Sequence, residues 1–67
     1  MFRNVVREMA VRRLSSDKLG KELGISGKTV RNKLENRTKF NIDEMIKIQQ
    51  LFGGGMTLDE LFQWVEG

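Results

Sequence analysis

Residues 16–34 read S-D-K-L-G-K-E-L-G-I-S-G-K-T-V-R-N-K-L, and the rest of the chain is organised around them. Apolar side chains recur in this stretch at helical spacing, at Leu19, Leu23, Ile25, Val30 and Leu34. Gly20 stands where a helix pressed against its neighbour needs a very small side chain, and Gly24 stands where the backbone must turn with a positive φ. Their joint spacing predicts two short helices connected by a tight turn at Gly24.

Length and composition restrict the kind of protein this can be. We expect the 67 residues to form a single domain over residues 1–67, without room for a separate ligand-sensing or catalytic domain. The chain has no cysteine and no histidine, so we expect no disulfide, no thiolate nucleophile and neither the usual zinc ligand nor the usual general base. No stretch resembles a signal peptide and no apolar run is long enough to span a bilayer, so we expect a soluble intracellular protein.

Charge is distributed unevenly between the two parts of the chain. Residues 1–40 hold 11 Lys and Arg against 4 Asp and Glu, a balance of +7, whereas residues 41–67 hold 1 against 5, a balance of −4. This asymmetry suggests that the first part faces a polyanion. An ordinary solvated charged surface is the alternative, and charge alone does not decide between the two.

Five short helices are expected to account for the chain, which contains no proline. The first is predicted over about residues 4–13, with Leu14 after it as a core anchor. Its apolar residues at helical spacing are Phe2, Val5, Val6 and Met9. Ser15 or Ser16 is expected to cap the second helix, and Ser26 the third.

The fourth and fifth helices each begin with a capping box and a hydrophobic staple. The boxes are Asn41 with Glu44 and Thr57 with Glu60, and the staples are Phe40 with Met45 and Met56 with Leu61. We expect the fourth helix to end at the run Gly53–Gly55 and to bury Ile42, Met45, Ile46, Ile48 and Phe52. The fifth is expected to carry Leu58, Leu61, Phe62 and Val65, with Trp64 near the edge of that stripe.

The two helices around Gly24 have the pattern of a DNA-binding helix-turn-helix, a motif of about residues 16–35 whose second helix enters the major groove. The predicted base-reading residues are Ser26, Gly27, Lys28, Arg31 and Asn32. Arg31 has the planar fork that matches guanine O6 and N7, and Asn32 can pair with adenine in bidentate fashion. The alternative is that these are ordinary solvated helix residues.

Phosphate contacts are expected on both sides of that helix, where they would position the protein without reading sequence. The predicted phosphate-contacting residues are Ser16, Lys18, Asn36, Arg37 and Lys39. For any single lysine of this set, a solvated surface position is as good an interpretation. Glu35 would either repel phosphate or accept from a cytosine amine, and the sequence does not choose between these roles.

Residues 14–40, L-S-S-D-K-L-G-K-E-L-G-I-S-G-K-T-V-R-N-K-L-E-N-R-T-K-F, are followed by I-D-E-M-I-K-I at 42–48 and M-T-L-D-E-L-F at 56–62. Together they resemble the lambda repressor/Cro-like family, and most closely the short regulators carried by phages and prophages of Gram-positive bacteria. The resemblance covers roughly residues 2–63. It implies an all-α, compact five-helix DNA-binding domain that acts in the cytoplasm of a bacterial host cell.

Two departures from the family pattern stand out. Many members begin the second helix with a glutamine that contacts a phosphate, whereas Ser16 stands here, so that contact is shorter or absent. Many also pair an arginine of the first helix with a glutamate late in the third, and the matching positions here are Met9 and Leu34. Replacing both partners avoids a buried unpaired charge, so we expect Met9 and Leu34 to touch.

The resulting functional hypothesis is a sequence-specific double-stranded DNA-binding transcriptional regulator, repressor-like, without cofactor, metal or small-molecule ligand. A module this small makes few contacts, so we expect a homodimer on two half-sites, with Leu61, Trp64 and Val65 as its contact. Trp64 could instead close the core beneath the first helix, and both interpretations stay open.

The alternative function is a protein-interaction module with a repurposed helix-turn-helix, antitoxin- or antirepressor-like, which the acidic second part favours somewhat. An enzyme is not expected, because the acidic residues stand at helix starts and no nucleophile–base pair is available.

Overall fold

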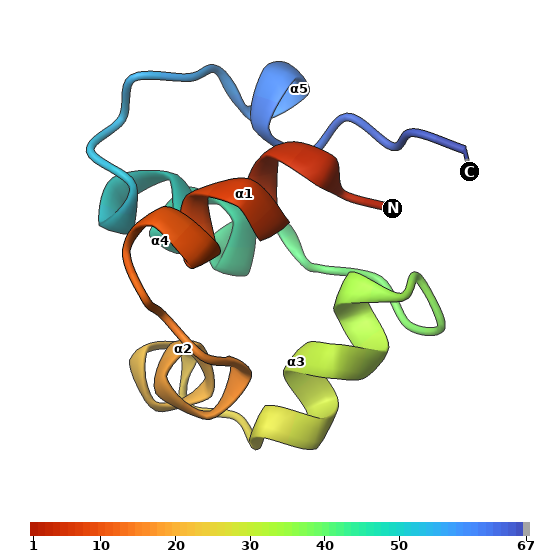
Figure 1. Cartoon of the computed structure of the whole chain (residues 1–67). Helices are drawn as coiled ribbons and strands as arrows, with labels where there is room; N and C mark the ends of the chain where they lie inside the picture. The colour runs from red at the N-terminus through yellow and green to blue at the C-terminus, as the bar shows by residue number, and fades with distance from the viewer. Residues whose placement is uncertain (67) are drawn as a thin grey trace.

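The computed structural model describes residues 1–66, and within them the chain is all-helical, as predicted (Figure 1). The helices, in chain order, are α1 (Arg3–Val11), α2 (Ser16–Leu23), α3 (Gly27–Leu34), α4 (Ile42–Leu51) and α5 (Leu58–Leu61). In the view of Figure 1, α2 and α3 form the lower half of the molecule, and α1, α4 and α5 form the upper half.

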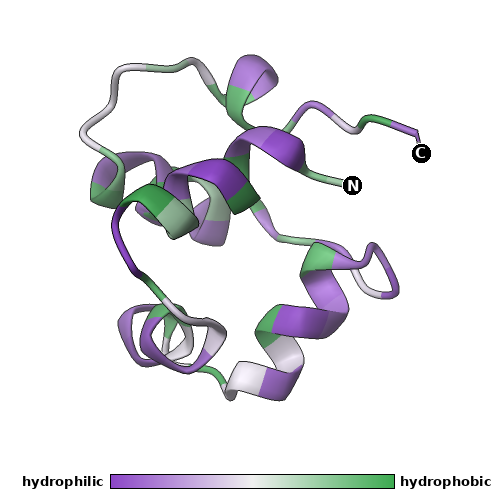
Figure 2. Ribbon diagram, in the orientation of Figure 1, coloured by the Kyte–Doolittle hydropathy of each residue, from purple (hydrophilic) through white to green (hydrophobic). Residues whose placement is uncertain are grey.

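The hydrophobic core lies between these two groups of helices. Each longer helix carries both hydrophobic and hydrophilic residues along its ribbon, as expected for helices with one buried face (Figure 2). The core consists of Val5, Met9, Leu19, Val30, Ile48, Phe52 and Leu61. Leu34 packs against the same cluster from α3, and Leu14 from the turn after α1. Met9 and Leu34 thus belong to one cluster, whereas their direct contact stays a prediction.

The turn between α2 and α3 has the geometry expected from its glycines. Gly24 ends α2 with φ 75°, and the Ile25 amide donates to the Gly20 carbonyl oxygen at 2.9 Å. A Cβ atom added to Gly20 would lie 2.4 Å from the Ile25 carbonyl oxygen, closer than non-bonded atoms approach. Both glycine predictions are confirmed. Of the two candidate caps, Ser15 is the N-cap, because its hydroxyl accepts from the Lys18 amide.

Two helices end on a left-handed residue that is not glycine, which the sequence analysis did not predict. After α1, Arg13 has φ 53°, and the Leu14 amide donates to the Met9 carbonyl oxygen at 2.8 Å. After α3, Asn36 has φ 63°, and the Arg37 amide donates to the Asn32 carbonyl oxygen at 2.9 Å. These bonds make the Schellman arrangement, which satisfies carbonyl oxygens of the last helical turn.

Both predicted capping boxes are confirmed. The Asn41 side chain accepts from the Glu44 amide at 2.8 Å, and the Glu44 carboxylate accepts from the Asn41 amide at 2.9 Å. Thr57 and Glu60 make the same reciprocal pair at the start of α5. α4 ends before Gly53, which has φ 82°, as expected for the glycine run.

Some predicted boundaries and buried positions are wrong. α1 covers Arg3–Val11 rather than residues 4–13, and Val6 on it is exposed. Ile42 and Ile46 are 57% and 38% exposed, although both were expected in the core. The reason is angular: the buried face of α4 is centred on Ile48 and Phe52, and Ile42 and Ile46 are turned to one side of it.

The last helix is also shorter than predicted. α5 ends at Leu61, so Trp64 and Val65 lie in an extended tail rather than on a helix. The Val65 amide donates to the Met1 carbonyl oxygen at 2.9 Å, and the Met1 amino group donates back to the Val65 carbonyl oxygen. Backbone pairing with the start of the chain therefore replaces the helix there.

Aromatic side chains of this tail pack against the rest of the fold. The aromatic cluster consists of Phe2, Phe40, Phe62 and Trp64, all packed edge to face. The Phe2 and Trp64 ring centroids are 5.0 Å apart, and the Trp64 side chain remains 39% exposed. Trp64 therefore packs in the aromatic cluster beside α1 and also presents part of its side chain to solvent.

Candidate nucleic-acid interface

The α3 helix separates its apolar and charged residues onto different faces. Val30 is fully buried and Leu34 packs against the core, whereas Lys28 and Arg31 are exposed. Asn32 is half-buried beside them. Packing of the apolar face fixes the orientation of the helix, so the two long cations point to solvent from a rigid element.

Ser26 begins this helix and uses its side chain locally. Its hydroxyl accepts from the Thr29 amide at 3.1 Å and lies 2.9 Å from the Thr29 hydroxyl oxygen. Ser26 is thus the N-cap of α3, as predicted, and its residue remains exposed. A base contact from Ser26 would have to share the hydroxyl with the cap.

Gly27 departs from the predicted set of base-reading residues. It is buried, and a Cβ atom added to it would lie 1.8 Å from the Asp17 carboxylate oxygen Oδ1 on α2. The absent side chain allows α2 and α3 to approach closely at their N-terminal ends. Gly27 therefore positions α3 and does not present a group to solvent.

The predicted phosphate-contacting residues lie in two places. Ser16 and Lys18 belong to the first turn of α2, where Ser16 is half-buried and Lys18 exposed. Asn36, Arg37 and Lys39 lie in the loop that follows α3, at the end of α3 remote from its contact with α2 (Figure 1). The two groups therefore flank α3, one near each of its ends.

The loop after α3 holds its charges through weak, exposed interactions. The Lys39 ammonium donates to the Asn36 side-chain oxygen at 2.9 Å, and Arg37 Nε lies 3.7 Å from a Glu35 carboxylate oxygen. The Arg37 and Glu35 side chains are 71% and 58% exposed, so water screens this ion pair. Arg37 can consequently exchange Glu35 for another anion at little cost in free energy.

Two cations of residues 1–40, Lys33 and Arg12, stabilise the fold rather than facing a polyanion, a role that the sequence did not reveal. Lys33 lies 3.0 Å from a Glu44 carboxylate oxygen, with both side chains largely buried, and joins α3 to α4. The Arg12 guanidinium donates to the Phe52 carbonyl oxygen at 2.9 Å and lies over the Phe52 ring. Both pairs join elements distant in sequence, so no local pattern indicates them.

Arg13 is a further exposed cation that the sequence analysis did not select. It occupies the left-handed position in the turn that leads into α2, close in sequence to Ser15 and Lys18. No spacing rule identifies it, because its position depends on where α1 ends. It adds an exposed positive charge to the turn before α2.

The predicted dimer contact is wrong in one residue. Leu61 is 1% exposed and belongs to the core, so it is not available to a partner. Val65 is half-buried and pairs its backbone with Met1, and Trp64 alone of the three is exposed.

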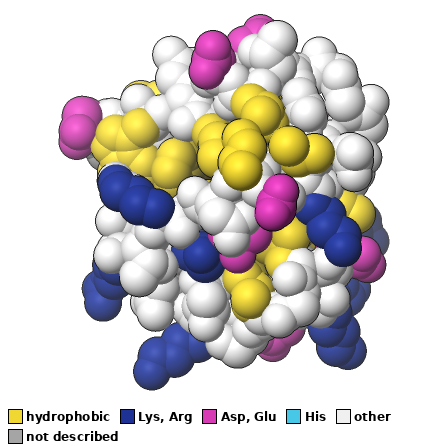
Figure 3. Space-filling view, turned by 180° about the vertical axis from the view of Figure 1, so that it is seen from behind, with side chains coloured by type: hydrophobic (Ala, Val, Ile, Leu, Met, Phe, Trp, Pro, Cys, Tyr) yellow, Lys and Arg dark blue, Asp and Glu magenta, His cyan; other side chains and the backbone are white. Residues whose placement is uncertain are grey.

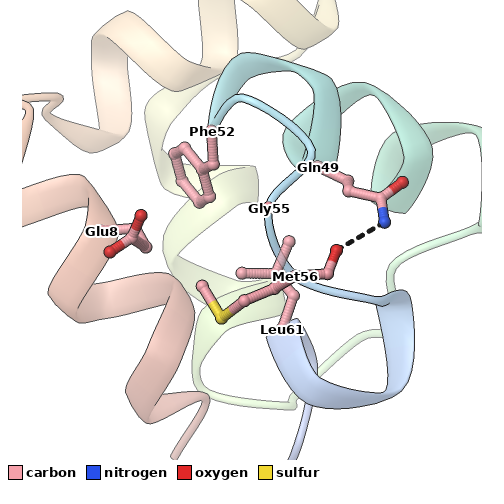
Figure 4. A pocket seen from close by; sticks show the side chains of 6 residues that line it. All are labelled: Glu8, Gln49, Phe52, Gly55, Met56 and Leu61. Carbon is pink, nitrogen blue, oxygen red and sulfur yellow. Dashed lines mark hydrogen bonds between the residues drawn. The ribbon is translucent and has the colours of Figure 1, made fainter.

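A small cavity of about 270 Å³ lies under the loop between α4 and α5 (Figure 4). Its lining residues are Glu8, Gln49, Phe52, Gly55, Met56 and Leu61. Gln49 donates across it to the Met56 carbonyl oxygen at 2.7 Å, and the Glu8 carboxylate binds Arg12 at 2.6 Å. The polar groups of the cavity are thus used to hold α1, α4 and the loop together.

Residues 1–66 contain no group of three acidic or metal-ligating side chains placed to hold a metal ion. None of the helices described here has the length and apolar character needed to cross a membrane. Comparison of the chain with protein-family models, with curated proteins and with solved structures finds no match.

Proposed function

We propose that the protein is a sequence-specific double-stranded DNA-binding transcriptional regulator of the lambda repressor/Cro type, with α2 and α3 as its helix-turn-helix. The observation that carries the proposal is the division of α3. Val30 is buried, while Lys28 and Arg31 are exposed on the same helix. A helix fixed in this way can enter a major groove with its cations toward the bases.

In this proposal three side chains of α3 contact the DNA, those of the exposed Lys28 and Arg31 and of the half-buried Asn32. Arg31 binds guanine O6 and N7, Asn32 binds adenine, and Lys28 reaches a guanine or a phosphate. Lys18 and the loop residues Arg37 and Lys39 bind phosphates on either side of the groove. Gly27 has no part in base contact, and no catalysis is involved.

The alternative of a protein-interaction module is favoured by the charge of the second part of the chain. Residues 41–67 carry a balance of −4, which duplex DNA would repel. A partner protein with a basic surface would bind that part. The two functions use different surfaces. Variants of α3 should therefore weaken DNA binding without weakening the binding of a partner protein to residues 41–67.

The test is a fluorescence anisotropy titration of duplex DNA, and separately of a single strand, across a salt series. Selection from a random duplex library supplies the preferred site. We expect duplex binding whose log K falls linearly with log salt, by about 0.9 for each phosphate contact. Arg31→Ala/Asn32→Ala should weaken binding to the selected site by roughly 10- to 100-fold, and binding to random duplex much less.

Arg3→Ala/Asn4→Ala is the matched control, because it removes the same side-chain types from the opposite half of the molecule. Asn4 donates to the Glu60 carbonyl oxygen, so circular dichroism must first show that this variant is folded. The absence of duplex binding at low salt would contradict the proposal. Equal losses in the two double variants would contradict the assignment of α3 as the reading helix.

A further inference from the structure

One face of α4 exposes two isoleucines that the core does not use. Ile42 and Ile46 lie one helical turn apart and are 57% and 38% exposed. Asp43 and Lys47, each one position further along, are also exposed. We call these four residues the α4 face. Figure 3, the view from behind, shows hydrophobic side chains gathered at the surface with charged groups beside them.

We propose that the α4 face binds a second copy of this chain, with the two α4 helices antiparallel about a two-fold axis. The inference rests on the proposed function, since recognition of two half-sites requires two copies. A two-fold contact must be self-complementary, so each residue that contacts the partner must match a residue on the same patch. The α4 face meets this condition in both its apolar and its charged residues.

The charges of the α4 face fit a second copy in reversed orientation. Asp43 follows Ile42 and Lys47 follows Ile46, so an acidic group stands at one end of the apolar pair and a basic group at the other. Reversing the partner helix brings Asp43 beside the partner's Lys47, and Lys47 beside the partner's Asp43. The isoleucines of the two copies then pack together, with one Asp–Lys ion pair at each end of the contact.

The α4 face is separate from the residues proposed to bind DNA. α4 belongs to the half of the molecule that excludes α2 and α3, so the dimer leaves the exposed cations of α3 free (Figure 1). The Lys33–Glu44 ion pair connects α3 to α4, so a contact on α4 fixes the direction of α3 as well. Leu61, expected earlier at a dimer contact, is buried in the core.

The contact is narrow and its affinity should be modest. A single helix face buries less than the roughly 1,200–2,000 Å² of a standard specific interface. Two copies on adjacent half-sites would have a high effective concentration, which makes a weak contact sufficient on an operator.

Sedimentation velocity of the full chain without DNA, from about 10 μM to about 1 mM, tests the proposal. We expect reversible dimer formation within that range. Ile46→Ser should raise the dissociation constant at least about tenfold, whereas the control Val11→Ser should not change it. Val11 is 71% exposed on α1, so the control removes a comparable apolar side chain from another face. A chain that remains monomeric throughout would overturn the proposal.

Charge exchange tests the antiparallel arrangement itself. Lys47→Asp should weaken the dimer, because two acidic groups then meet at each end of the contact. Asp43→Lys/Lys47→Asp should restore it, because exchanging both signs preserves complementarity between copies. A double variant no stronger than the single one would overturn the proposal, provided thermal unfolding shows that both are folded.

This measurement is independent of DNA, so failure of dimerisation and failure of DNA binding are separate results. A chain that dimerises through α4 without binding duplex DNA contradicts the proposed function alone. A monomeric chain that binds duplex DNA contradicts the α4 dimer alone.

Discussion

Replacing Gly20 by alanine should destabilise the fold through one identifiable collision. The new Cβ atom would lie 2.4 Å from the Ile25 carbonyl oxygen and 3.2 Å from the Ser26 carbonyl carbon. Neither atom can move away alone, because both belong to the backbone of the turn. The Ile25 amide is moreover bonded to the Gly20 carbonyl oxygen at 2.9 Å. Relief of the collision requires α2 and the turn to separate.

The expected size of the effect follows from two opposing contributions. Overpacking against backbone is expected at the upper end of its usual range, about 3 kcal/mol. Alanine gains about 1 kcal/mol over glycine in a helix interior, which opposes the loss. The net loss is therefore about 2 kcal/mol, out of about 3–10 kcal/mol for a chain of this length. It corresponds to a fall in Tm of about 10 °C.

Two other glycines supply matched controls. Gly24 has φ 75° and, among the described residues, nothing within 4 Å of an added Cβ, so Gly24→Ala measures backbone strain alone, about 1 kcal/mol. Gly55 has neither a positive φ nor such a neighbour within residues 1–66, so Gly55→Ala should change stability by less than about 0.5 kcal/mol. Urea and thermal unfolding followed by circular dichroism measure all three. A Gly20→Ala variant as stable as Gly55→Ala would refute the collision.

Three further substitutions probe features outside the turn. Arg13→Gly should stabilise the fold by about 1 kcal/mol in urea unfolding, because glycine adopts the left-handed conformation without a Cβ penalty; an unchanged or lower stability would contradict this. Lys33→Met should lower stability by up to about 3 kcal/mol, since it leaves Glu44 buried without its cation; adding Glu44→Gln should recover part of the loss, and a purely additive double variant would refute the coupling. Trp64→Ala should cost about 1 kcal/mol through the lost contact with Phe2, and a loss in Phe2→Leu/Trp64→Ala equal to or larger than the two single losses combined would contradict a direct pair.

The features that sequence predicted well are those determined within a few residues. Gly24 and the Asn41–Glu44 box have local causes, a positive φ in one case and a side chain that reaches the backbone three positions away in the other. The same holds for Ser26 as the cap of α3. Such rules require no knowledge of how the helices pack.

The features that sequence predicted poorly depend on tertiary arrangement. Ile42 and Ile46 fit a helical apolar pattern, but the pattern does not say which edge of a broad stripe faces the core. Val65 also fits a helical pattern, but its backbone pairs with Met1, which is distant in sequence, instead of continuing the helix. Gly27 fell among the candidate base-reading residues by position alone, and only its approach to Asp17 reveals that it is buried.

The two ends of α3 are held by different means, and neither contact uses Arg31. Near its start, Gly20 and Gly27 bring α2 and α3 together so closely that a methyl group on either would collide. Near its end, Lys33 ties the helix to Glu44 of α4 through a largely buried ion pair. Substitutions at these points should change stability and recognition together, because they move the whole helix. The exposed Arg31 side chain makes no hydrogen bond or ion pair to another helix among the described residues. Its substitution should therefore change DNA recognition without changing stability.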